Sequence, residues 1–386
     1  MKIEIQKYRQ IADMLTTLQE VQSEIASGII TWEEICDDVN RMVLSINNAL
    51  WNCDSVGADV ALNEWIDIHT LFINQQLAAN TDLDRRFKWL MTYVDIIDRE
   101  TIILNVKKEL CNYPPELLPG LQNYYQTYDY FWGSLDISNN IYDVITNRVD
   151  VLIEHRADFL WLYDRLYDYR SKNVLVLMLE HWLTFSGDMI WDMKESNFPD
   201  YYDPDIFVPT DEEVVVDLGA YDGDSAIGYI QSYGHYKRIY CYEITPSTVE
   251  KLKENMSEYP DIVVRHKAVG DKEEDLFLED DQSMRSETTL SERGSIRVPV
   301  VSLDSDIEEQ ITLLKMDIEG SEQSAIRGCK NHIINDRPKI LACVYHGNKD
   351  IFEVPRLIDS IRDDYKFYLR SNGRQWGPAE IVLFAI

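Results

Sequence analysis

The chain has 386 residues, 45% of them hydrophobic and 27% charged, which is typical of globular proteins and excludes a disordered or fibrous chain. Its 37 basic and 68 acidic side chains give a net charge of −31, which disfavours nucleic acid and anionic membrane surfaces as partners. No apolar run is long enough to span a bilayer, and the N-terminus lacks the apolar core of a signal peptide. We therefore expect a cytoplasmic protein with no membrane insertion and two or three domains.

The first 140 residues carry the periodicity of amphipathic helices. Apolar residues recur every three or four positions from Tyr8 to Ile25, and similar stretches cover residues 58–78 and 84–108. We expect a helical N-terminal domain of unknown role over 1–140. It could form a homo-oligomer or dock onto a partner.

Helical periodicity resumes at residue 141, and we expect 141–205 to be a helical lead-in to the next domain. Just before it, residues 121–132 are crowded with aromatic side chains. These could stack on a sugar or pack a helix junction. The packing role is favoured because aromatic side chains bury large areas wherever helices meet.

Six cysteines are scattered along the chain without a C-x-x-C pair, which argues against a zinc site and against a disulfide framework. They are Cys36, Cys53, Cys111, Cys241, Cys329 and Cys343. We expect free thiols.

From residue 206 onward, short β-branched runs alternate with helical patterns. The runs are VVVDL, RIYCYE, DIVVRHKAV, LLKMDI and KILACVY. This alternation predicts an α/β fold whose parallel sheet is covered by helices on both faces. The last two runs, YKFYLR and IVLFAI, predict a hairpin appended to that sheet.

The first chemical motif is VVVDLGAYDGDS, in which Asp217 ends a strand and Gly219 and Gly223 permit a tight turn. A pyrophosphate would require G-x-G-x-x-G and a helix start free of acidic side chains, but Asp222 and Asp224 crowd this turn. The pattern therefore indicates a cationic or zwitterionic ligand group. The amino-acid end of S-adenosylmethionine fits this description better than a dinucleotide does.

The second motif is Glu243, which ends the strand RIYCYE about two dozen residues after Gly219. An acidic side chain at that place binds ribose hydroxyls in nucleoside-binding folds of this kind. The two motifs together favour a cofactor that contains adenosine.

The third motif is KMDIEGSE. Lys315, Asp317 and Glu319 alternate at the end of an otherwise apolar strand, so they should project from one face near the carboxyl edge of the sheet. Ionisable groups in such a strand are costly unless they are paired or functional. A purely structural lysine–carboxylate network is the alternative.

With HKAVGD and VVSLD, these motifs make the chain resemble the FkbM-type family of S-adenosylmethionine-dependent methyltransferases over residues 206–386. The resemblance implies a class I methyltransferase fold, Rossmann-like, with a seven-stranded sheet whose last strand is antiparallel. It also implies S-adenosyl-L-methionine as the cofactor and methyl transfer to a hydroxyl of a sugar or of a polyketide-like product.

The resemblance also implies roles for single residues. It places the methionine end of the cofactor near Asp217, Gly219 and Ser225, the ribose near Glu243, and the adenine near Ala268 and Val269. Tyr221 and Asp222 of the first turn are assigned to the cofactor as well. Family members more often have Asn than Asp at the position of Asp222.

An alcohol is a poor nucleophile, so the reaction requires a general base, for which Asp317, Glu319 and His346 are the candidates. The same three residues could instead hold a divalent metal ion. We expect O-methylation of a sugar, glycan or glycosylated metabolite. In an alternative hypothesis, the substrate is bound to a carrier or partner protein, and the N-terminal helices dock onto that protein. A third hypothesis, an NAD-dependent oxidoreductase, is disfavoured by the aspartates of the first turn.

Overall fold

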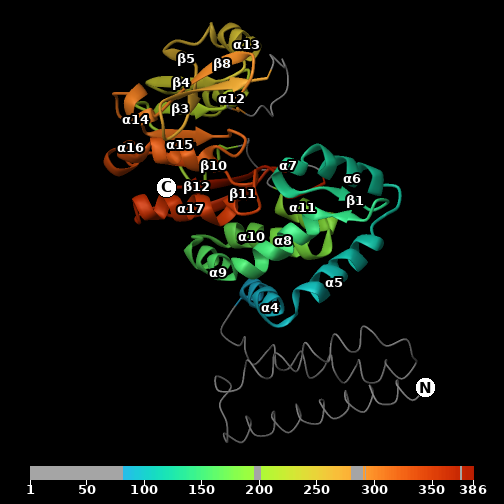
Figure 1. The fold of residues 1–386 in the computed structure, drawn as a ribbon. Helices are drawn as coiled ribbons and strands as arrows, with labels where there is room; N and C mark the ends of the chain where they lie inside the picture. The colour runs from blue at the N-terminus through green and yellow to red at the C-terminus, as the bar shows by residue number, and fades with distance from the viewer. Residues whose placement is uncertain (1–80, 195–200, 280–289, 292, 374–375) are drawn as a thin grey trace, which may run out of the picture. The chain divides into compact units, whose positions relative to one another are not determined.

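The computed structural model describes residues 81–194, 201–279, 290–291, 293–373 and 376–386 (Figure 1). The chain divides into two compact units, Met1–Asn105 and Val106–Ile386. The helices expected between residues 1 and 80 lie outside the described residues.

The described part of the first unit contains α4 (Asp82–Ile96) and the beginning of α5 (Arg99–Cys111), which continues into the second unit. Helix α4 begins with a reciprocal cap, because the Thr81 hydroxyl accepts from the Asp84 amide and the Asp84 carboxylate accepts from the Thr81 amide. The predicted helical stretch 84–108 therefore consists of two helices, with a break at residues 97–98.

Six further helices follow in the second unit. They are α6 (Leu118–Thr127), α7 (Asp129–Trp132), α8 (Asp143–Glu154), α9 (Arg156–Arg165), α10 (Tyr169–Thr184) and α11 (Gly187–Met193). The region before residue 141 was expected to be entirely helical, and this is wrong, because β1 (Leu135–Asp136) pairs there with β2 (Ile141–Tyr142). The connecting turn is stabilised by the Asp136 carboxylate, which accepts from Ser138 and Asn139.

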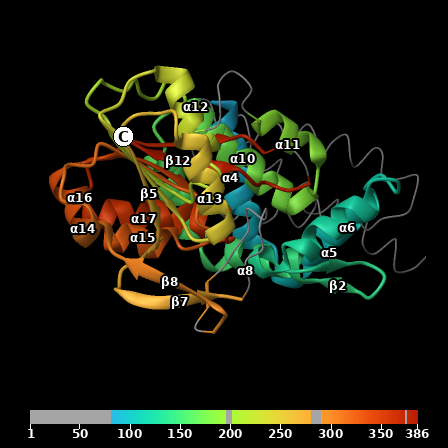
Figure 2. The same ribbon diagram turned by 90° about the horizontal axis from the view of Figure 1, so that it is seen from above.

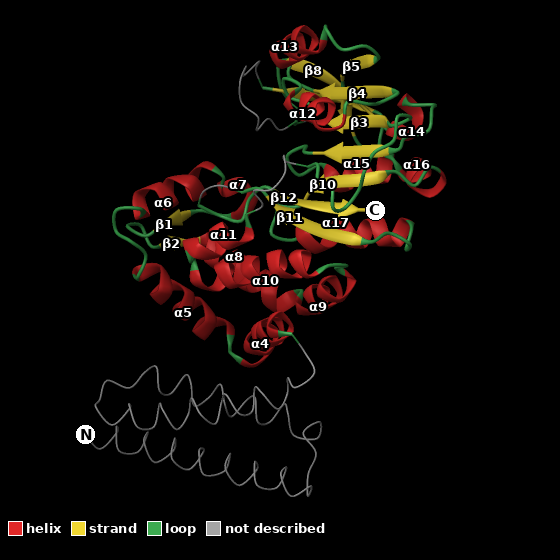
Figure 3. Cartoon of the chain, turned by 180° about the vertical axis from the view of Figure 1, so that it is seen from behind, coloured by secondary structure: helices red, strands yellow, loops and turns green. Residues whose placement is uncertain are grey.

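A mixed sheet of seven strands forms the centre of the second unit (Figure 3). Its strands are β3 (Val214–Leu218), β4 (Arg238–Glu243), β5 (Ile262–His266), β9 (Leu313–Met316), β10 (Lys339–Cys343), β11 (Phe367–Ser371) and β12 (Ile381–Ala385). Their order is β11-β12-β10-β9-β3-β4-β5, and β12 runs antiparallel to both of its neighbours.

The antiparallel last strand is confirmed, and so is the hairpin appended to the parallel strands, since the β11–β12 pair lies next to β10 at one end of the sheet. Strand β12 lies between β10 and β11, with Ile340 opposite Ala385 and Cys343 opposite Val382. All five residues of β12 are buried. A strand that is apolar on both faces is suited to an interior position, which leaves β11 at the edge.

Helices cover both faces of the sheet (Figure 2). The helices α12 (Asp224–Tyr233) and α13 (Pro246–Met256) lie on one face, where Ala226 and Leu252 pack with alternate strand residues such as Val215 and Cys241. The opposite face carries α14 (Leu303–Asp306), α15 (Glu322–Gly328), α16 (Lys330–Asn335) and α17 (Asp350–Ile361). The predicted two-sided covering is confirmed.

A second, three-stranded sheet has the order β6-β8-β7, formed by β6 (Ala268–Val269), β7 (Glu274–Leu278) and β8 (Ile296–Val301). Leu278, Val298 and Val300 are buried in its own small core. Most of the hydroxyl-rich segment that joins β7 to β8 lies outside the described residues.

The helical lead-in is joined to the edge strand β11 by a buried arginine. Arg370 donates from Nη2 to Asp168 Oδ2 and from Nε to Asp203 Oδ2, each at 2.7 Å. Leu369 N donates to the Ser171 hydroxyl at 2.9 Å, at the beginning of α10. Residues on both sides of α10 are thereby fixed to β11.

The aromatic residues of 121–132 pack a helix junction, as the favoured interpretation predicted. Tyr125 and Trp132 are buried, and the Trp132 indole donates to the Tyr345 carbonyl at 2.7 Å. The four cysteines of the described residues are free thiols, as expected. None of the described helices has the length and apolar character needed to cross a bilayer.

Candidate active site

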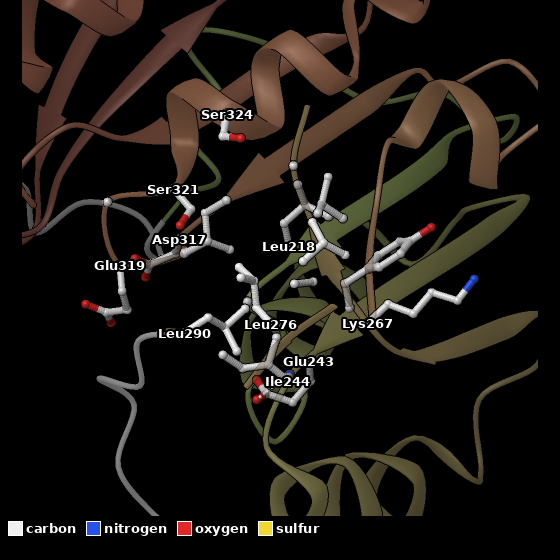
Figure 4. A pocket seen from close by; sticks show the side chains of 18 of the residues that line it. Leu218, Glu243, Ile244, Lys267, Leu276, Leu290, Asp317, Glu319, Ser321 and Ser324 are labelled. Carbon is white, nitrogen blue, oxygen red and sulfur yellow. Dashed lines mark hydrogen bonds between the residues drawn. The ribbon is translucent and has the colours of Figure 1, made fainter. Parts of the chain in front are cut away.

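A cavity of about 440 Å³ opens at the carboxyl ends of β3, β4 and β9 (Figure 4). This is the edge at which open α/β sheets bind ligands, because loops leave adjacent parallel strands there in divergent directions. Asp317 and Glu319 lie at one end of the cavity, and Glu243 and Lys267 lie at the other.

The turn after β3 brings two backbone segments into contact. Gly219 has φ +73°, and a Cβ at this position would come within 1.9 Å of the Asp317 carbonyl oxygen. Only glycine fits such a place. Gly219 of the first motif is therefore required for the close approach of the loops that follow β3 and β9.

Asp217 lies beneath the cavity and is not one of the residues that line it. Its carboxylate is 2.9 Å from Lys315 Nζ and accepts a hydrogen bond from the Ser225 hydroxyl at 2.5 Å. Burial alone would lower the pKa of Lys315, but Asp217 and Asp317 raise it above its ordinary value. Lys315 is thus a fixed cation in the cavity wall, and the structural lysine–carboxylate network exists for this pair.

Glu243 ends β4 on the cavity wall. One carboxylate oxygen accepts from the amides of Ile244 and Thr245, both at 2.8 Å, and the other accepts from the Tyr221 amide at 3.1 Å. Burial raises the pKa of Glu243 above its ordinary value, although these amides oppose the shift. The second oxygen has a lone pair left for a ligand hydroxyl.

An apolar wall adjoins Glu243. Ala268 and Val269 of β6 contribute to it, together with Ile244, Leu276 and Leu290. A wall of this kind suits the flat face of a heterocycle. Leu276 and Leu290 come from the second sheet and the segment before β8, and no sequence pattern marked them as site residues.

Two aspartates of the first turn are arranged differently from the prediction. Asp222 is not among the lining residues and lies 3.4 Å from Lys251 Nζ on α13. Asp224 lines the cavity instead, and burial raises its pKa. The reason is the N-cap at Gly223 (φ +97°), which makes Asp224 the first residue of α12.

The acidic end of the cavity is formed by the turn after β9. The strand ends at Met316, so the predicted alternation along the strand does not reach Glu319, which has φ +54° in a tight turn before Gly320. This turn nevertheless brings the three candidate catalytic residues together. His346 Nε2 is 3.4 Å from Asp317 Oδ1 and 3.5 Å from Glu319 Oε2.

Asp317 and Glu319 line the cavity, whereas His346 lies behind them with 1% of its side chain exposed. His346 Nδ1 is 2.9 Å from Glu322 Oε1. Burial alone would lower the pKa of His346, but Glu322, Asp317 and Glu319 raise it to about 9. The ligand atoms of Asp317, Glu319 and His346 lie within 4.8 Å of one another, a spacing that a metal ion could bridge.

Two partners of this cluster were not found from the sequence. The Tyr201 hydroxyl donates to Asp317 Oδ2 at 2.8 Å, and Glu322 also accepts from the Ile318 amide at 3.0 Å. Tyr201 belongs to a polar stretch that carries no periodic pattern, so no signal marked it. Glu322 is part of KMDIEGSE, and its place in that motif was the available clue, since the structure buries it at the start of α15.

Residues 217–373 match the family model of the methyltransferase FkbM domain. Over these residues the chain is similar to the FkbM methyltransferase family, and the α/β fold and the cavity at the carboxyl ends of the strands agree with that similarity. The resemblance found from the sequence motifs is thereby confirmed.

Among solved structures, methyltransferase FkbM from Methylobacillus flagellatus KT is similar to this chain, with 24% identity and a TM-score of 0.53. The likeness covers 62% of this chain and 62% of that one, which is less than two thirds of its length. It supports the fold. No curated protein matches the chain in a sequence search.

Two more distant structures are similar to part of this chain. An rRNA methylase from Streptococcus thermophilus has 13% identity and a TM-score of 0.32, covering 46% of this chain and 88% of its own. A methyltransferase from Streptococcus mutans in complex with SAH has 11% identity and a TM-score of 0.31, covering 46% and 90%. These two likenesses are too distant to bear on function.

Proposed function

We propose that the protein is an S-adenosylmethionine-dependent O-methyltransferase that acts on a hydroxyl of a sugar, glycan or glycosylated metabolite. The observation that carries the proposal is a single cavity with a nucleoside-type wall at Glu243 and a carboxylate pair, Asp317 and Glu319, at the other end. Its volume of about 440 Å³ lies in the range of cofactor and substrate sites.

The residues of the cavity fit the parts of the cofactor. Glu243 would accept hydrogen bonds from ribose hydroxyls, and Ala268 and Val269 would contact the adenine face. Asp224 and the Lys315 ammonium provide opposite charges for a zwitterionic amino-acid group. S-adenosylmethionine, when bound, supplies a methyl group on a positively charged sulfur.

The acidic end would bind and activate the acceptor. The acceptor oxygen forms a bond to the methyl carbon, the carbon–sulfur bond breaks, and its electron pair remains on sulfur. The hydroxyl proton must go to a base in reach of the cavity, and Glu319 is the base we propose. His346 lies behind the carboxylates, so we assign it a positioning role.

The charge of this end supports a neutral, hydroxyl-rich acceptor. Carboxylates accept hydrogen bonds from vicinal hydroxyls, and they repel acceptors that carry phosphate or carboxylate groups. Asp317 and Glu319 are both partly exposed to the cavity, with 23% and 14% of their side chains accessible. We therefore expect neutral glycosides to be methylated in preference to acidic ones.

The test is transfer of a labelled methyl group to a panel of neutral sugars, acidic sugars and amines. Glu319→Gln should lower kcat by about a hundredfold or more while leaving cofactor affinity unchanged. The matched control is Glu308→Gln, an exposed carboxylate outside the cavity, which should leave kcat unchanged. Methylation of amines alone would contradict the assigned acceptor class.

A further inference from the structure

We propose that Asp317, Glu319 and His346 bind a divalent cation at the acidic end of the cavity. The binding itself follows from the geometry of these side chains, whereas its part in the reaction rests on the proposed function. The three residues come from the turn after β9 and from the segment after β10, so two separate parts of the fold contribute ligands.

The distances suit a common metal centre. Ligand atoms at about 2.0–2.2 Å from one ion are separated from their neighbours by about 3.0–3.5 Å in tetrahedral or octahedral sites. His346 Nε2 is 3.4 Å from Asp317 Oδ1 and 3.5 Å from Glu319 Oε2. These two separations fit an ion placed between the side chains, and all three ligand atoms lie within 4.8 Å of one another.

The second observation is an unpartnered nitrogen. His346 is buried, and within the described residues its Nε2 makes no hydrogen bond, although it faces the two carboxylates. His332 is a buried histidine of the ordinary structural kind, since its Nδ1 lies 2.6 Å from Asp336 and its Nε2 lies 3.1 Å from the Ile307 carbonyl. His181 Nε2 also lacks a hydrogen-bond partner, but Nε2 of His346 is the one that faces two carboxylates, so it is placed to share a ligand with them.

The outer contacts are those of a metal site. A histidine that binds a metal usually donates its other ring N–H to a carboxylate, and here Glu322 lies 2.9 Å from Nδ1. The Ile318 amide fixes Glu322, and the Tyr201 hydroxyl occupies the outer oxygen of Asp317. His346 and Asp317 are thus held with Nε2 and Oδ1 directed at the shared centre, where the Tyr345 hydroxyl also donates to Asp317 Oδ1 at 3.4 Å.

The donor set defines the class of ion. Two carboxylate oxygens suit Mg²⁺ and Mn²⁺, and one imidazole nitrogen favours a transition metal such as Mn²⁺. Because Asp317 and Glu319 line the cavity, the remaining coordination positions face the proposed acceptor site. A cation there would bind an acceptor oxygen and lower its pKa, which assists removal of the proton by Glu319 Oε1, because Oε2 is the oxygen that faces the ion.

The experiment is titration of the full, tag-free chain with Mn²⁺, followed by electron paramagnetic resonance without any cofactor. We expect one bound ion per chain and a ¹⁴N coupling from a directly bound imidazole. His346→Gln should abolish the nitrogen coupling and weaken binding by about tenfold or more. His332→Gln is the matched control and should change neither.

The wild-type spectrum decides the proposal even if a variant does not fold. Absence of stoichiometric Mn²⁺ binding, or bound Mn²⁺ without nitrogen coupling, would overturn it. Calorimetry with S-adenosylhomocysteine on the same sample separates the two proposals. If the chain binds S-adenosylhomocysteine but not Mn²⁺, the metal site is refuted and the proposed function stands. If it binds Mn²⁺ but not S-adenosylhomocysteine, the metal site stands and the proposed function is refuted.

Discussion

Lys315 and Asp217 form a buried ion pair of 2.9 Å directly beneath the cavity, and Lys315 also donates to the Gly219 carbonyl at 2.9 Å. The pair joins the adjacent strands β3 and β9, in which Asp217 lies opposite Lys315. The ammonium reaches the cavity wall while the carboxylate does not. The sheet itself therefore positions a positive charge beside the carboxylates of the site.

Breaking this pair should destabilise the protein strongly. Lys315→Met leaves the Asp217 carboxylate buried without its cation, and we expect a loss of about 3 to 5 kcal/mol in the free energy of unfolding. The double variant Lys315→Met/Asp217→Leu should recover most of that loss because no unpaired charge remains. Urea unfolding measures both. Equal stability of the single variant and the wild type would refute the structural role of the pair.

Gly219→Ala should be harmful for a steric reason. The residue has φ +73° and its Cβ would lie 1.9 Å from the Asp317 carbonyl, so the positive φ alone costs about 1 to 3 kcal/mol before the contact is relieved. We expect a lower unfolding free energy and weaker binding of S-adenosylhomocysteine.

The control is Gly187→Ala at the start of α11, where a Cβ meets nothing within 4 Å. It should be neutral or slightly stabilising. If the two variants unfold at the same urea concentration, the close approach of the loops is not what requires glycine at 219.

Glu243→Gln tests the nucleoside wall. The variant keeps the size of the side chain but removes the charge that would accept hydrogen bonds from ribose hydroxyls, which is worth about 1.5 to 3 kcal/mol. We expect calorimetry to show binding of S-adenosylhomocysteine weakened by about tenfold or more. Glu250→Gln, an exposed carboxylate on α13, should bind as the wild type does. Unchanged binding by Glu243→Gln would exclude the ribose role.

Acid sensitivity should depend on Arg370. Burial alone would raise the pKa of Asp168, but hydrogen bonds from Arg370 and Ser171 hold it below its ordinary value of 3.8. The ionised form thus stabilises the fold at pH values above 3.8, and this contribution is lost as the pH falls through the lower folded-state pKa.

Arg370→Met removes the main hydrogen-bond partner of Asp168. The free energy of unfolding of this variant should therefore begin to fall at a higher pH than that of the wild type. Urea unfolding between pH 3 and 7 measures the difference. If the unfolding free energies of the two proteins change with pH in parallel, the hydrogen bonds between Arg370 and Asp168 do not cause the loss of stability in acid.

Much of the sheet could be predicted from the sequence, because a strand that is buried on both faces leaves a continuous apolar run. RIYCYE corresponds to the observed strand β4 residue for residue. The place of β12 could not be predicted, since an apolar run shows that a strand is interior and does not show between which neighbours it lies. The β1–β2 ladder was missed because two-residue strands have no detectable period.

In the candidate site, too, some residues could be predicted from the sequence and others could not. Gly219 and Glu243 follow strands and carry a local signal, and the cavity includes both. Asp222 and Asp224 stand two positions apart in one acidic turn, and only the backbone conformation at Gly223 decides which one faces the cavity. Tyr201 reaches Asp317 across 116 positions of sequence, and no local pattern encodes such a contact.

The most direct test of the proposed cofactor is a calorimetric titration of the full chain with S-adenosylhomocysteine and, separately, with NAD. We expect saturable binding of S-adenosylhomocysteine at one site per chain and no binding of NAD, because Asp224 places a carboxylate at the start of α12, where a pyrophosphate would have to lie. Binding of NAD without binding of S-adenosylhomocysteine would contradict it.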